Sequence, residues 1–358
     1  MEQNSASIVI GTSAELIKIA PLIRRLEKAN YQYKVLYTSQ HVGGLDALLL
    51  SLQIYEARPR FVILRRSADL TSSFQTFKWI FDVALFLFRN LKGKTLVIVH
   101  GDTMTTLMGS LLGKFKFCTI AHIEAGVRSG SIFHPLPEEF IRRLVGKLAQ
   151  IHFPPSPRES INLSERKVIL PTTHNTGLDN ILDIFEEEIK SNKIWENRNL
   201  VLVSLHRTEF LANRQVFRDT IIALNKLVDY CKIIVVMDQR FKKALEVHNA
   251  QLDNRITNLS KLPYAEFMSM LLYSKAVITD SGGLQQEMIF LRIPGVIHRV
   301  SCEEEIIPEI HLLSRWDCQS LIAFILNRGL VGSRCVPQVD PATDYIIDEI
   351  RKRNLIEK

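Results

Sequence analysis

Short apolar runs alternate with helix-period segments along the first half of the chain. The runs that predict strands are residues 7–11, 34–38, 61–64, 95–100, 118–124, 151–153 and 168–170. Between them, segments such as 14–29 and 138–150 repeat apolar residues at the period of an amphipathic helix. Strands that alternate with helices predict a parallel sheet whose strands are joined by helical crossovers.

A second series of the same kind follows a charged, helical stretch at residues 180–199. Its apolar runs are 200–205, 232–236, 255–259, 276–279 and 295–298. We therefore expect an α/β protein with two Rossmann-like, doubly wound parallel-sheet domains. The expected limits are 1–178 and 179–340, followed by a C-terminal helix at 341–358 that packs back on the first domain. Such sheets bind ligands beyond the carboxyl ends of their strands, which favours an active site in the cleft between the domains.

Composition limits the class of protein without naming a function. A length of 358 residues exceeds what one hydrophobic core usually supports. The formal charge of +7 comes without any run of five like charges, which argues against a nucleic-acid binder and suits an anionic substrate or an anionic membrane face. The five cysteines are widely spaced and form no CxxC pair, so neither a disulfide framework nor a zinc site is expected.

The N-terminal residues and the longest apolar stretch bear on where the protein is located in the cell. The first residues pass directly into a strand without a basic and apolar leader. The longest candidate membrane stretch, residues 79–91, is too short to span and is interrupted by Asp82 and Arg89. These features predict a cytoplasmic protein. The aromatic character of 79–91 indicates a buried helix or a homodimer face, with weak contact to a membrane surface as the alternative.

The strongest local signal is Thr-Asp-Ser-Gly-Gly-Leu-Gln-Gln-Glu at residues 279–287, which follows a strand and opens a helix. The backbone N–H groups of Ser281, Gly282 and Gly283 at a helix N-terminus attract phosphate. Glu287, about one turn into the helix, would reach ribose hydroxyls. The alternative is an ordinary serine cap followed by permissive glycines.

Acidic residues end two neighbouring strands of the first domain. Asp102 follows the run 95–100, and Glu124 ends the run 118–124. Glu138 opens the next helix, and Arg142 lies on the same helix face at i, i+4. Three carboxylates that converge on one site suit general acid/base catalysis. Acidic residues in a first helical turn are otherwise common as complements to the helix dipole.

Two further segments carry candidate binding residues. His206 and Arg207 end the first strand of the second domain and would bind a diphosphate, although a histidine there is often only a satisfied polar residue. The loop at 11–18 is not a GxGxxG fingerprint, which argues against a dinucleotide cofactor. Lys18 would face the site only if its helix starts near Ala14.

Taken in order, these segments resemble one family, the non-hydrolysing UDP-N-acetylglucosamine 2-epimerases, which share the fold of the two-Rossmann (GT-B) glycosyltransferases. The resemblance runs from Gly11 to about Glu305. A further match is Asn175-Thr176 followed by Asp179, similar to the family's Gly-Asn-Thr-x-x-Asp connection. The stretches that carry the resemblance most specifically are residues 101–106, 122–128, 137–143, 206–209 and 279–287.

The resemblance implies a reaction and a role for each candidate residue. UDP leaves C1 while the C2 proton is removed, and UDP then adds back after a proton returns to the opposite face, which converts UDP-N-acetylglucosamine to UDP-N-acetylmannosamine without a nicotinamide or a metal. The expected catalytic residues are Asp102, Glu124, Glu138 and His206. The residues expected to bind the UDP-sugar are Lys18, Arg142, Arg207, Ser281, Gly282, Gly283 and Glu287.

Several positions depart from the family pattern. Ser13-Ala14 replaces Arg-Pro in the first loop, and Glu304 stands where the family has an arginine. A negative charge in place of a positive one near phosphate changes the interaction by on the order of a few kcal/mol, so either Arg299 or Arg292 compensates, or the loop faces elsewhere, or the sugar differs. Val42 and the stretch 236–238 also depart from the family's allosteric contacts, so regulation by substrate is not expected.

The leading hypothesis is therefore an epimerase for surface polysaccharide synthesis, which acts as a cytoplasmic homodimer. A hydrolysing epimerase that releases N-acetylmannosamine and UDP is one alternative, but its His-x-His-Gly-Gly-Glu motif is replaced by His-Ile-Glu-Ala-Gly at 122–126. A GT-B glycosyltransferase is the second alternative, because two expected arginines are missing. A binding relative without turnover is the third, against which the intact carboxylates and His206 argue.

Overall fold

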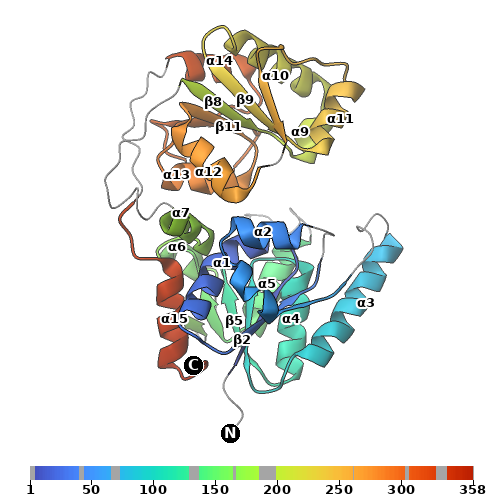
Figure 1. Cartoon of the computed structure of the whole chain (residues 1–358), viewed down its shortest axis with the longest axis vertical. Coiled ribbons are helices and arrows are strands. Elements are labelled where there is room, and N and C mark those ends of the chain that lie inside the picture. Colours follow the sequence, from blue (N-terminus) through green and yellow to red (C-terminus); the bar gives the residue numbers. More distant parts are fainter. Residues whose placement is uncertain are drawn as a thin grey trace. The chain divides into compact units, whose positions relative to one another are not determined.

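The structure is a computed structural model that describes residues 5–39, 44–65, 73–128, 137–163, 167–184, 199–260, 262–302, 306–327 and 337–357. The chain divides into two compact units (Figure 1). Unit 1 comprises Met1–Ile184 and Val339–Lys358, and unit 2 comprises Phe185–Gln338. The sequence had placed the first boundary between residues 178 and 179.

Unit 1 is built on a parallel sheet whose strand order is β3-β2-β1-β4-β5-β6-β7. The central strands β1 and β4 are buried along their whole length, because helices cover both faces of the sheet. This burial explains their continuous apolar runs. The strands are β1 (Ala6–Ile10), β2 (Tyr33–Tyr37), β3 (Phe61–Ile63), β4 (Leu96–His100), β5 (Thr119–Ile123), β6 (Ile151–Phe153) and β7 (Val168–Ile169).

The helices of unit 1 pack on the two faces of this sheet. Side chains of α3, α4 and α5 form one apolar layer with the strands, while α1 and α15 pack together (Figure 1). Gly109 lets α4 approach β1 closely, since a Cβ there would lie 3.0 Å from Val9 Cγ1. The helices are α1 (Ser13–Lys28), α2 (Leu45–Ser51), η1 (Tyr55–Arg60), α3 (Ser73–Asn90), α4 (Met104–Phe115), α5 (Glu138–Leu148), α6 (Pro157–Ser160), η2 (Thr176–Leu178), α7 (Asp179–Ile184) and α15 (Ala342–Lys352).

Unit 2 repeats the architecture with strand order β10-β9-β8-β11-β12-β13, again entirely parallel in the described residues. Its core includes three packed phenylalanines, with Phe217 5.5 Å from Phe210 and 5.3 Å from Phe241 between ring centroids. The strands are β8 (Leu200–Ser204), β9 (Lys232–Met237), β10 (Thr257–Ser260), β11 (Ala276–Thr279), β12 (Gly295–Ile297) and β13 (His311–Leu313). The helices are α9 (Thr208–Ala212), α10 (Arg214–Leu227), α11 (Gln239–Val247), α12 (Tyr264–Tyr273), α13 (Gly282–Phe290) and α14 (Cys318–Asn327).

The predicted fold class, two parallel α/β domains of Rossmann type, is confirmed. Sequence reasoning missed β13, which pairs with β12 through only three residues and carries too short an apolar run to stand out.

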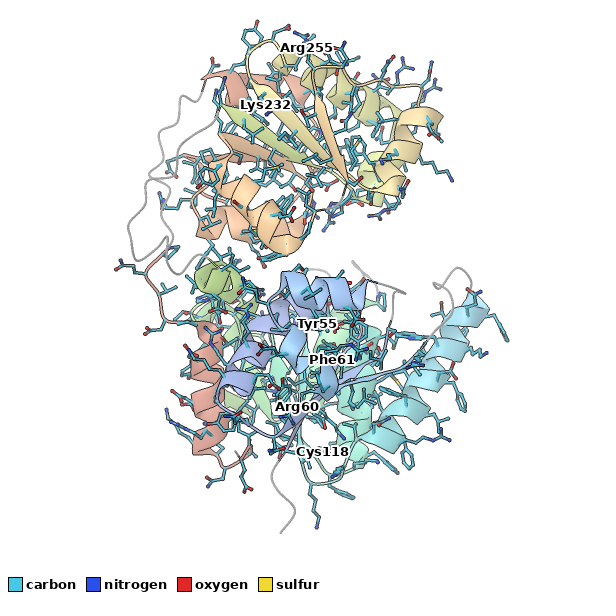
Figure 2. The ribbon with its side chains drawn as sticks, viewed as in Figure 1. Tyr55, Arg60, Phe61, Cys118, Lys232 and Arg255 are labelled. Atoms are coloured by element: carbon cyan, nitrogen blue, oxygen red, sulfur yellow. The ribbon has the colours of Figure 1, made fainter. Side chains whose placement is uncertain are left out.

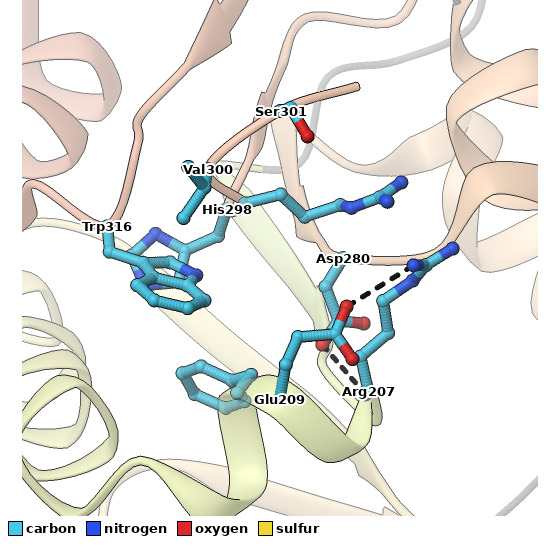
Figure 3. A pocket seen from close by; sticks show the side chains of 9 residues that line it. Arg207, Glu209, Asp280, His298, Val300, Ser301 and Trp316 are labelled. Atoms are coloured by element: carbon cyan, nitrogen blue, oxygen red, sulfur yellow. Dashed lines mark hydrogen bonds and ion pairs between the residues drawn. The ribbon is translucent and has the colours of Figure 1, made fainter. Parts of the chain in front are cut away.

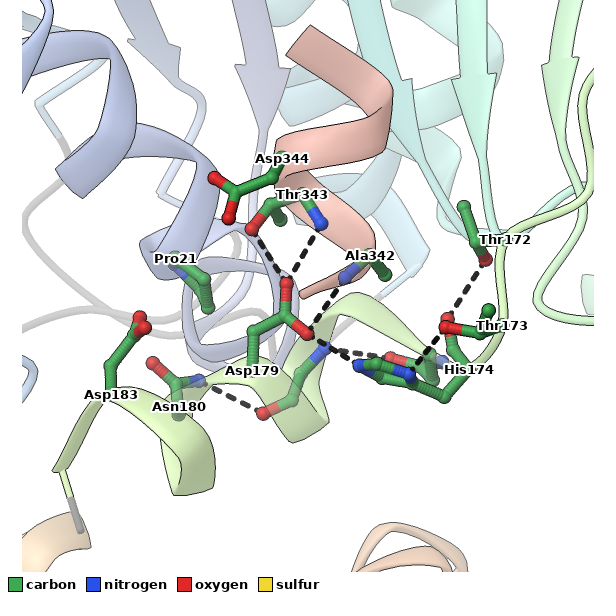
Figure 4. Close-up of polar contacts among 12 residues, drawn as sticks. Pro21, Thr172, Thr173, His174, Asp179, Asn180, Asp183, Ala342, Thr343 and Asp344 are labelled. Carbon is green, nitrogen blue, oxygen red and sulfur yellow. Dashed lines mark hydrogen bonds and ion pairs between the residues drawn. The ribbon is translucent and has the colours of Figure 1, made fainter. Parts of the chain in front are cut away.

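The C-terminal helix α15 lies in unit 1 and is held there by one buried carboxylate (Figure 4). Asp179 accepts hydrogen bonds from the backbone N–H of Ala342 and Thr343 at 3.1 and 2.8 Å, and from the Thr343 hydroxyl at 2.6 Å. His174 Nε2 lies 2.5 Å from the same carboxylate. Pro341 has no capping side chain, so Asp179 does for this helix what an N-cap residue normally does.

Three findings concern membrane helices, cysteines and metal ligands among the described residues. None of the described helices is long and apolar enough to cross a membrane. Cys118, Cys231, Cys302 and Cys318 are free thiols, and Cys335 lies outside the described residues. No group of three or more potential metal ligands occurs among the residues that the structure describes.

Candidate active site

The carboxylates of unit 1 come together at the carboxyl ends of β4 and β5. These strands are parallel neighbours, with Val99 opposite His122, so the residues that follow them meet at one edge of the sheet. Glu124 follows β5 directly, and Asp102 lies two positions beyond the end of β4. The sequence predicts that Glu138 joins them; the charge of Glu124 acts on Asp102, while the place of Glu138 in this group stays a prediction.

Glu124 occupies an unusual backbone conformation. Its φ of +63° lies in the left-handed region, which non-glycine residues adopt only at a cost that the surrounding structure must offset. A hydrogen bond of 3.0 Å from its backbone N–H to the carbonyl of Phe153 holds this turn. Gly101 and Gly126, which also have positive φ, make the two turns around it. Strain of this kind is typical of residues that position a functional side chain.

Polar groups surround the side chain of Glu124. Lys18 Nζ lies 2.8 and 2.7 Å from its two oxygens, and Asn175 donates to it at 3.0 Å. The ring of His100 lies 3.3 Å away. Burial alone would raise the pKa of Glu124, but the Lys18 ammonium and the other charges hold it at about 2. Glu124 is therefore an anion at neutral pH.

Asp102 has the opposite tendency. Burial raises the pKa of its carboxyl above the ordinary value, although Arg142 Nη2 lies 2.5 Å from Oδ2 and opposes the shift. The charge of Glu124 adds to the rise. Two neighbouring carboxyls whose environments push their pKa values apart are the usual sign of an acid and a base in one site.

The sequence pointed to Glu138, but Glu139 is the glutamate of α5 that is buried and hydrogen-bonded. Glu138 begins α5 and is partly exposed, with Oε2 buried and without a hydrogen bond to a described residue. Glu139 is fully buried and accepts from Arg143 Nε at 2.9 Å. It also lies 3.9 Å from Arg142 and 3.7 Å from Arg128. Glu139 thus helps to hold Arg142 against Asp102, a role that sequence reasoning missed.

Glu15 is a second residue that sequence reasoning passed over. Its carboxylate accepts hydrogen bonds from the backbone N–H of Gly11 and Thr12, both at 2.9 Å, and completes a capping box with Thr12. Thr103 Oγ1 also donates to it at 2.8 Å. One buried carboxylate therefore ties the loop after β1 to the loop that carries Asp102. The capping-box spacing, Thr followed three residues later by Glu, was the available signal.

Lys18 faces the site because α1 begins early, at Ser13. Ser13, which stands where the family has an arginine, is the first residue of that helix. The loop therefore offers no cation at this position. Glu304 and Val42 lie outside the described residues. The departure at residues 236–238 has a local explanation, since Asp238 caps α11 by accepting from the N–H of Phe241 at 2.9 Å.

Three buried histidines lie on the strands β4, β5 and β6 that lead to the site. Burial lowers the pKa of His100 to about 3, that of His122 to about 4 and that of His152 to about 3. All three are therefore neutral in the folded protein at neutral pH. His122 Nε2 lies 2.8 Å from the carbonyl of Gly101, so it supports the turn that leads to Asp102.

These histidines predict a loss of stability in mild acid. In the unfolded chain each takes up a proton near pH 6.5, while in the folded state each stays neutral down to about pH 4. The unfolded state thus binds more protons in this window, and the free energy of unfolding falls as the pH falls from 6.5 to 4, by about 1.4 kcal/mol per pH unit for each histidine. His152→Leu should reduce that slope by one proton, as measured by urea unfolding at several pH values. An unchanged slope would show that His152 is already protonated in the native state.

Unit 2 contributes a second polar cluster, at the carboxyl ends of β8 and β11. Asp280 is buried and accepts from the backbone N–H of His206 at 3.0 Å and of Arg207 at 2.9 Å. The His206 ring, 40% exposed, lies 3.7 Å from the same carboxylate. Burial raises the pKa of Asp280, although the two backbone donors oppose the shift. Asp280, which the sequence had not singled out, fixes the backbone that presents His206 and Arg207.

The glycines of the 279–287 segment lie in the first turn of α13. Ser281 is the N-cap of this helix, and its hydroxyl accepts from the N–H of Leu284 at 3.4 Å. A Cβ added at Gly282 or Gly283 would meet nothing within 4 Å, so both glycines border open space. The capping interpretation is thus correct, and it leaves the first N–H groups of the helix accessible to an anion. Glu287 accepts from the Tyr264 hydroxyl at 2.9 Å.

A pocket of about 210 Å³ opens beside the cluster of His206, Arg207 and Asp280 (Figure 3). Arg207, Asp280 and Arg299 are among the residues that line it. Arg299, one of two arginines proposed to compensate for the missing family cation, therefore lies close to the His206–Arg207 segment. Arg292 lies instead in the turn after α13, with a φ of +52°.

Both the sequence and the fold have well-defined relatives. Residues 24–305 match the family model described as UDP-N-acetylglucosamine 2-epimerase. The UDP-N-acetylglucosamine 2-epimerase of Campylobacter jejuni is 30% identical over 328 residues, which cover 83% of this chain and 81% of that protein. The protein of the same name from Methanocaldococcus jannaschii is 29% identical over 316 residues, covering 83% of this chain and 84% of that protein.

Solved structures agree with these matches. The UDP-GlcNAc 2-epimerase of Methanocaldococcus jannaschii has a TM-score of 0.74 at 25% identity and covers 98% of this chain and 99% of its own. The S. aureus MnaA–UDP co-structure has a TM-score of 0.78 at 25% identity, covering 99% and 98%.

Proposed function

This chain belongs to the UDP-N-acetylglucosamine 2-epimerase family, and on that premise we propose that it interconverts UDP-N-acetylglucosamine, or a modified UDP-N-acetylhexosamine, and its C2 epimer. The observation that carries the proposal is the pair of carboxyls in unit 1, since the pKa of Glu124 is held at about 2 while that of Asp102 is raised. Inversion at C2 requires one group to remove a proton and another to deliver one to the opposite face of the sugar.

The proposed reaction has two stages. The bond between C1 and the UDP oxygen breaks while a carboxylate takes the C2 proton, which yields a 2-acetamidoglucal and UDP. A proton then returns to C2 from the opposite face, and UDP adds back to C1. Glu124 carries no proton at neutral pH and can therefore accept one, although the ion pair with Lys18 lowers its basicity. Asp102 is suited to hold a proton because its pKa is raised. Glu138, with a buried oxygen that lacks a described partner, is the third group available for proton transfer.

The remaining residues are assigned to binding. In unit 2 the N–H groups of Gly282 and Gly283 at the start of α13 are suited to the diphosphate, and Glu287 to the ribose. The N–H of Ser281 already donates to the Thr279 hydroxyl at 3.0 Å, so Ser281 would contribute through its side chain. His206 would stabilise the departing UDP, with Arg207 beside it. In unit 1 Lys18 and Arg142 hold the two carboxylates and supply positive charge for the substrate. That one substrate engages both clusters stays a prediction.

Proton exchange at C2 tests the proposal directly. The purified protein is incubated with UDP-N-acetylglucosamine in deuterated water and followed by NMR. Deuterium at C2 with UDP still attached is the expected result. Release of free N-acetylmannosamine would support the hydrolysing alternative, and transfer of the sugar to an added acceptor would support the glycosyltransferase. Binding of UDP without exchange would overturn epimerisation of this substrate.

Replacement of Gly282 by alanine should lower the affinity for UDP without lowering the stability of the fold. Gly282→Ala places its Cβ in open space, and alanine is favoured over glycine within helices by up to about 1 kcal/mol. The variant should therefore unfold no more easily than the original protein. Its affinity for UDP should fall about tenfold, because the methyl stands where a phosphate would approach the N–H groups.

Isothermal titration with UDP measures the affinity, and Gly146→Ala is the matched control. Gly146 lies within α5, where an added Cβ would be at an ordinary 3.7 Å from Leu163. Equal UDP affinity in the Gly282→Ala variant and the original protein would remove α13 from the diphosphate site.

The setting of the enzyme is also a proposal. Its proposed role is in surface polysaccharide synthesis in the cytoplasm. A homodimer is supported by exposed apolar side chains on α3, where Phe74, Phe77 and Phe81 are 78%, 73% and 69% exposed. Trp79 does not belong to this surface, since it is buried and donates to the carbonyl of Thr38 at 3.1 Å. Sedimentation equilibrium of the Phe77→Ser variant tests whether this face joins two copies.

A further inference from the structure

A second cluster of exposed aromatic side chains lies where α3 and α4 end. Phe88 is 47% exposed, Phe115 66% and Phe117 83%. The rings of Phe88 and Phe115 are 6.2 Å apart between centroids, so they form one surface. Phe117 directly precedes Cys118, which Figure 2 labels at the lower edge of unit 1. We call these three phenylalanines and the basic residues around them the Phe115 patch.

The charge of the Phe115 patch is entirely of one sign. No aspartate or glutamate occurs at residues 83–101 or 103–123. Lys116 Nζ lies 4.6 Å from the centroid of the Phe88 ring and donates to the carbonyl of Leu91 at 2.7 Å. Lys34 donates to the carbonyl of Asn90 at the same helix end. The basic residues of the patch are Lys34, Arg89, Lys92, Lys94, Lys114 and Lys116.

Three of these cations, Lys34, Lys92 and Lys116, lie close enough to influence one another. Burial lowers the pKa of Lys34 first, and the ammonium groups of Lys92 and Lys116 lower it further. The C-terminal end of a helix favours positive charge, which accounts for Lys34 and Lys116. It also accounts for Arg89 and Lys114, which lie in the last turns of α3 and α4. It does not account for Lys92 and Lys94, nor for three phenylalanines exposed among these cations.

We propose that the Phe115 patch binds the surface of an anionic phospholipid bilayer. Aromatic side chains insert at the level of the headgroups, and the surrounding lysines and arginine attract the negative lipids. Both parts are needed, because one weak apolar anchor binds only marginally without an electrostatic contribution.

Charge complementarity selects this occupant over a second copy of the chain. Two Phe115 patches in contact would bring two sets of six cations together, which disfavours association. Residues 73–82 of α3 are different, because Lys78 and Asp82 give this segment both signs. That segment suits contact between copies, whereas the Phe115 patch suits an anionic surface.

The position of the patch is compatible with catalysis in unit 1. Lys94 and Phe117 precede β4 and β5, so the patch lies at the amino ends of these strands. Asp102 and Glu124 follow the carboxyl ends of the same strands. The patch and the carboxylates therefore occupy opposite edges of one sheet, and binding at the former leaves the latter uncovered.

Co-sedimentation of the whole protein with vesicles tests the proposal. Binding is expected to vesicles that contain phosphatidylglycerol, to weaken as salt is added, and to be absent with phosphatidylcholine alone. The Phe115→Ser, Phe117→Ser double variant should bind at least about tenfold less, since the aromatic anchor is lost. Tyr230→Ser, on a similarly exposed aromatic residue of unit 2 (64%), should bind as the original protein does.

Each other outcome contradicts the proposal. Unchanged binding by the double variant would show that the patch is not the anchor, and equal loss in both variants would indicate non-specific adhesion. Absence of vesicle binding, with a double variant that changes from dimer to monomer, would assign the patch to a second copy. Preferential binding to duplex nucleic acid would assign it to that polymer. Epimerisation should be unchanged in the double variant, so the result does not depend on the proposed reaction.

Discussion

Replacement of Glu124 by glutamine is expected to slow exchange of the C2 proton by about 10²- to 10⁴-fold, the contribution typical of a positioned general acid or base. Glutamine keeps the shape of the side chain and can still accept hydrogen bonds from Lys18 and Asn175. It cannot take up a proton at neutral pH. UDP affinity should change by only a few-fold, because the proposed diphosphate contacts lie in unit 2. Deuterium incorporation followed by NMR, with UDP titration in parallel, measures both quantities.

Glu56→Gln is the matched control for this experiment. Glu56 is exposed on η1, which leads into the amino end of β3, and the same change of charge there should leave exchange unaltered. The melting temperature of the Glu124→Gln variant must also be compared, because Lys18 loses its charged partner. Exchange that survives at the original rate in a folded Glu124→Gln protein would exclude Glu124 from proton transfer.

Replacement of Asp179 by alanine should destabilise unit 1 by about 3 to 5 kcal/mol, the usual cost of removing one partner from a buried charged network. The change would leave two backbone N–H groups at the start of α15, the Thr343 hydroxyl and the His174 ring without their acceptor. Buried donors without partners account for most of that cost. Urea unfolding measures the free energy, and amide hydrogen exchange should show that α15 loses protection first.

Asp344→Asn is the comparison within the same helix. The Asp344 carboxylate is 57% exposed and pairs with Arg25 at 2.6 Å. An exposed ion pair contributes less than about 1 kcal/mol. Similar losses for the two variants would show that the capping contacts of Asp179 are not what holds α15 on unit 1.

The candidate site was partly visible in the sequence for a definite reason. Asp102 and Glu124 each follow an apolar run, and parallel strands place such residues at one edge regardless of the side chains between them. Ser281 and the two glycines were recognisable because a helix start has its own local chemistry. Glu139, Glu15 and Asp280 escaped notice because their roles depend on what each buried carboxylate contacts.

By itself the sequence determined the class of fold, the approximate strands and helices, and the residues at the strand ends. Those properties follow from periodicity and local capping, which involve residues close together in the chain. Only the tertiary structure decided that the pKa of Glu124 is held at about 2 and that of Asp102 is raised, because those shifts come from burial and from the distant charges of Lys18 and Arg142. The attachment of α15 to Asp179, 163 residues earlier, likewise had no signal in spacing.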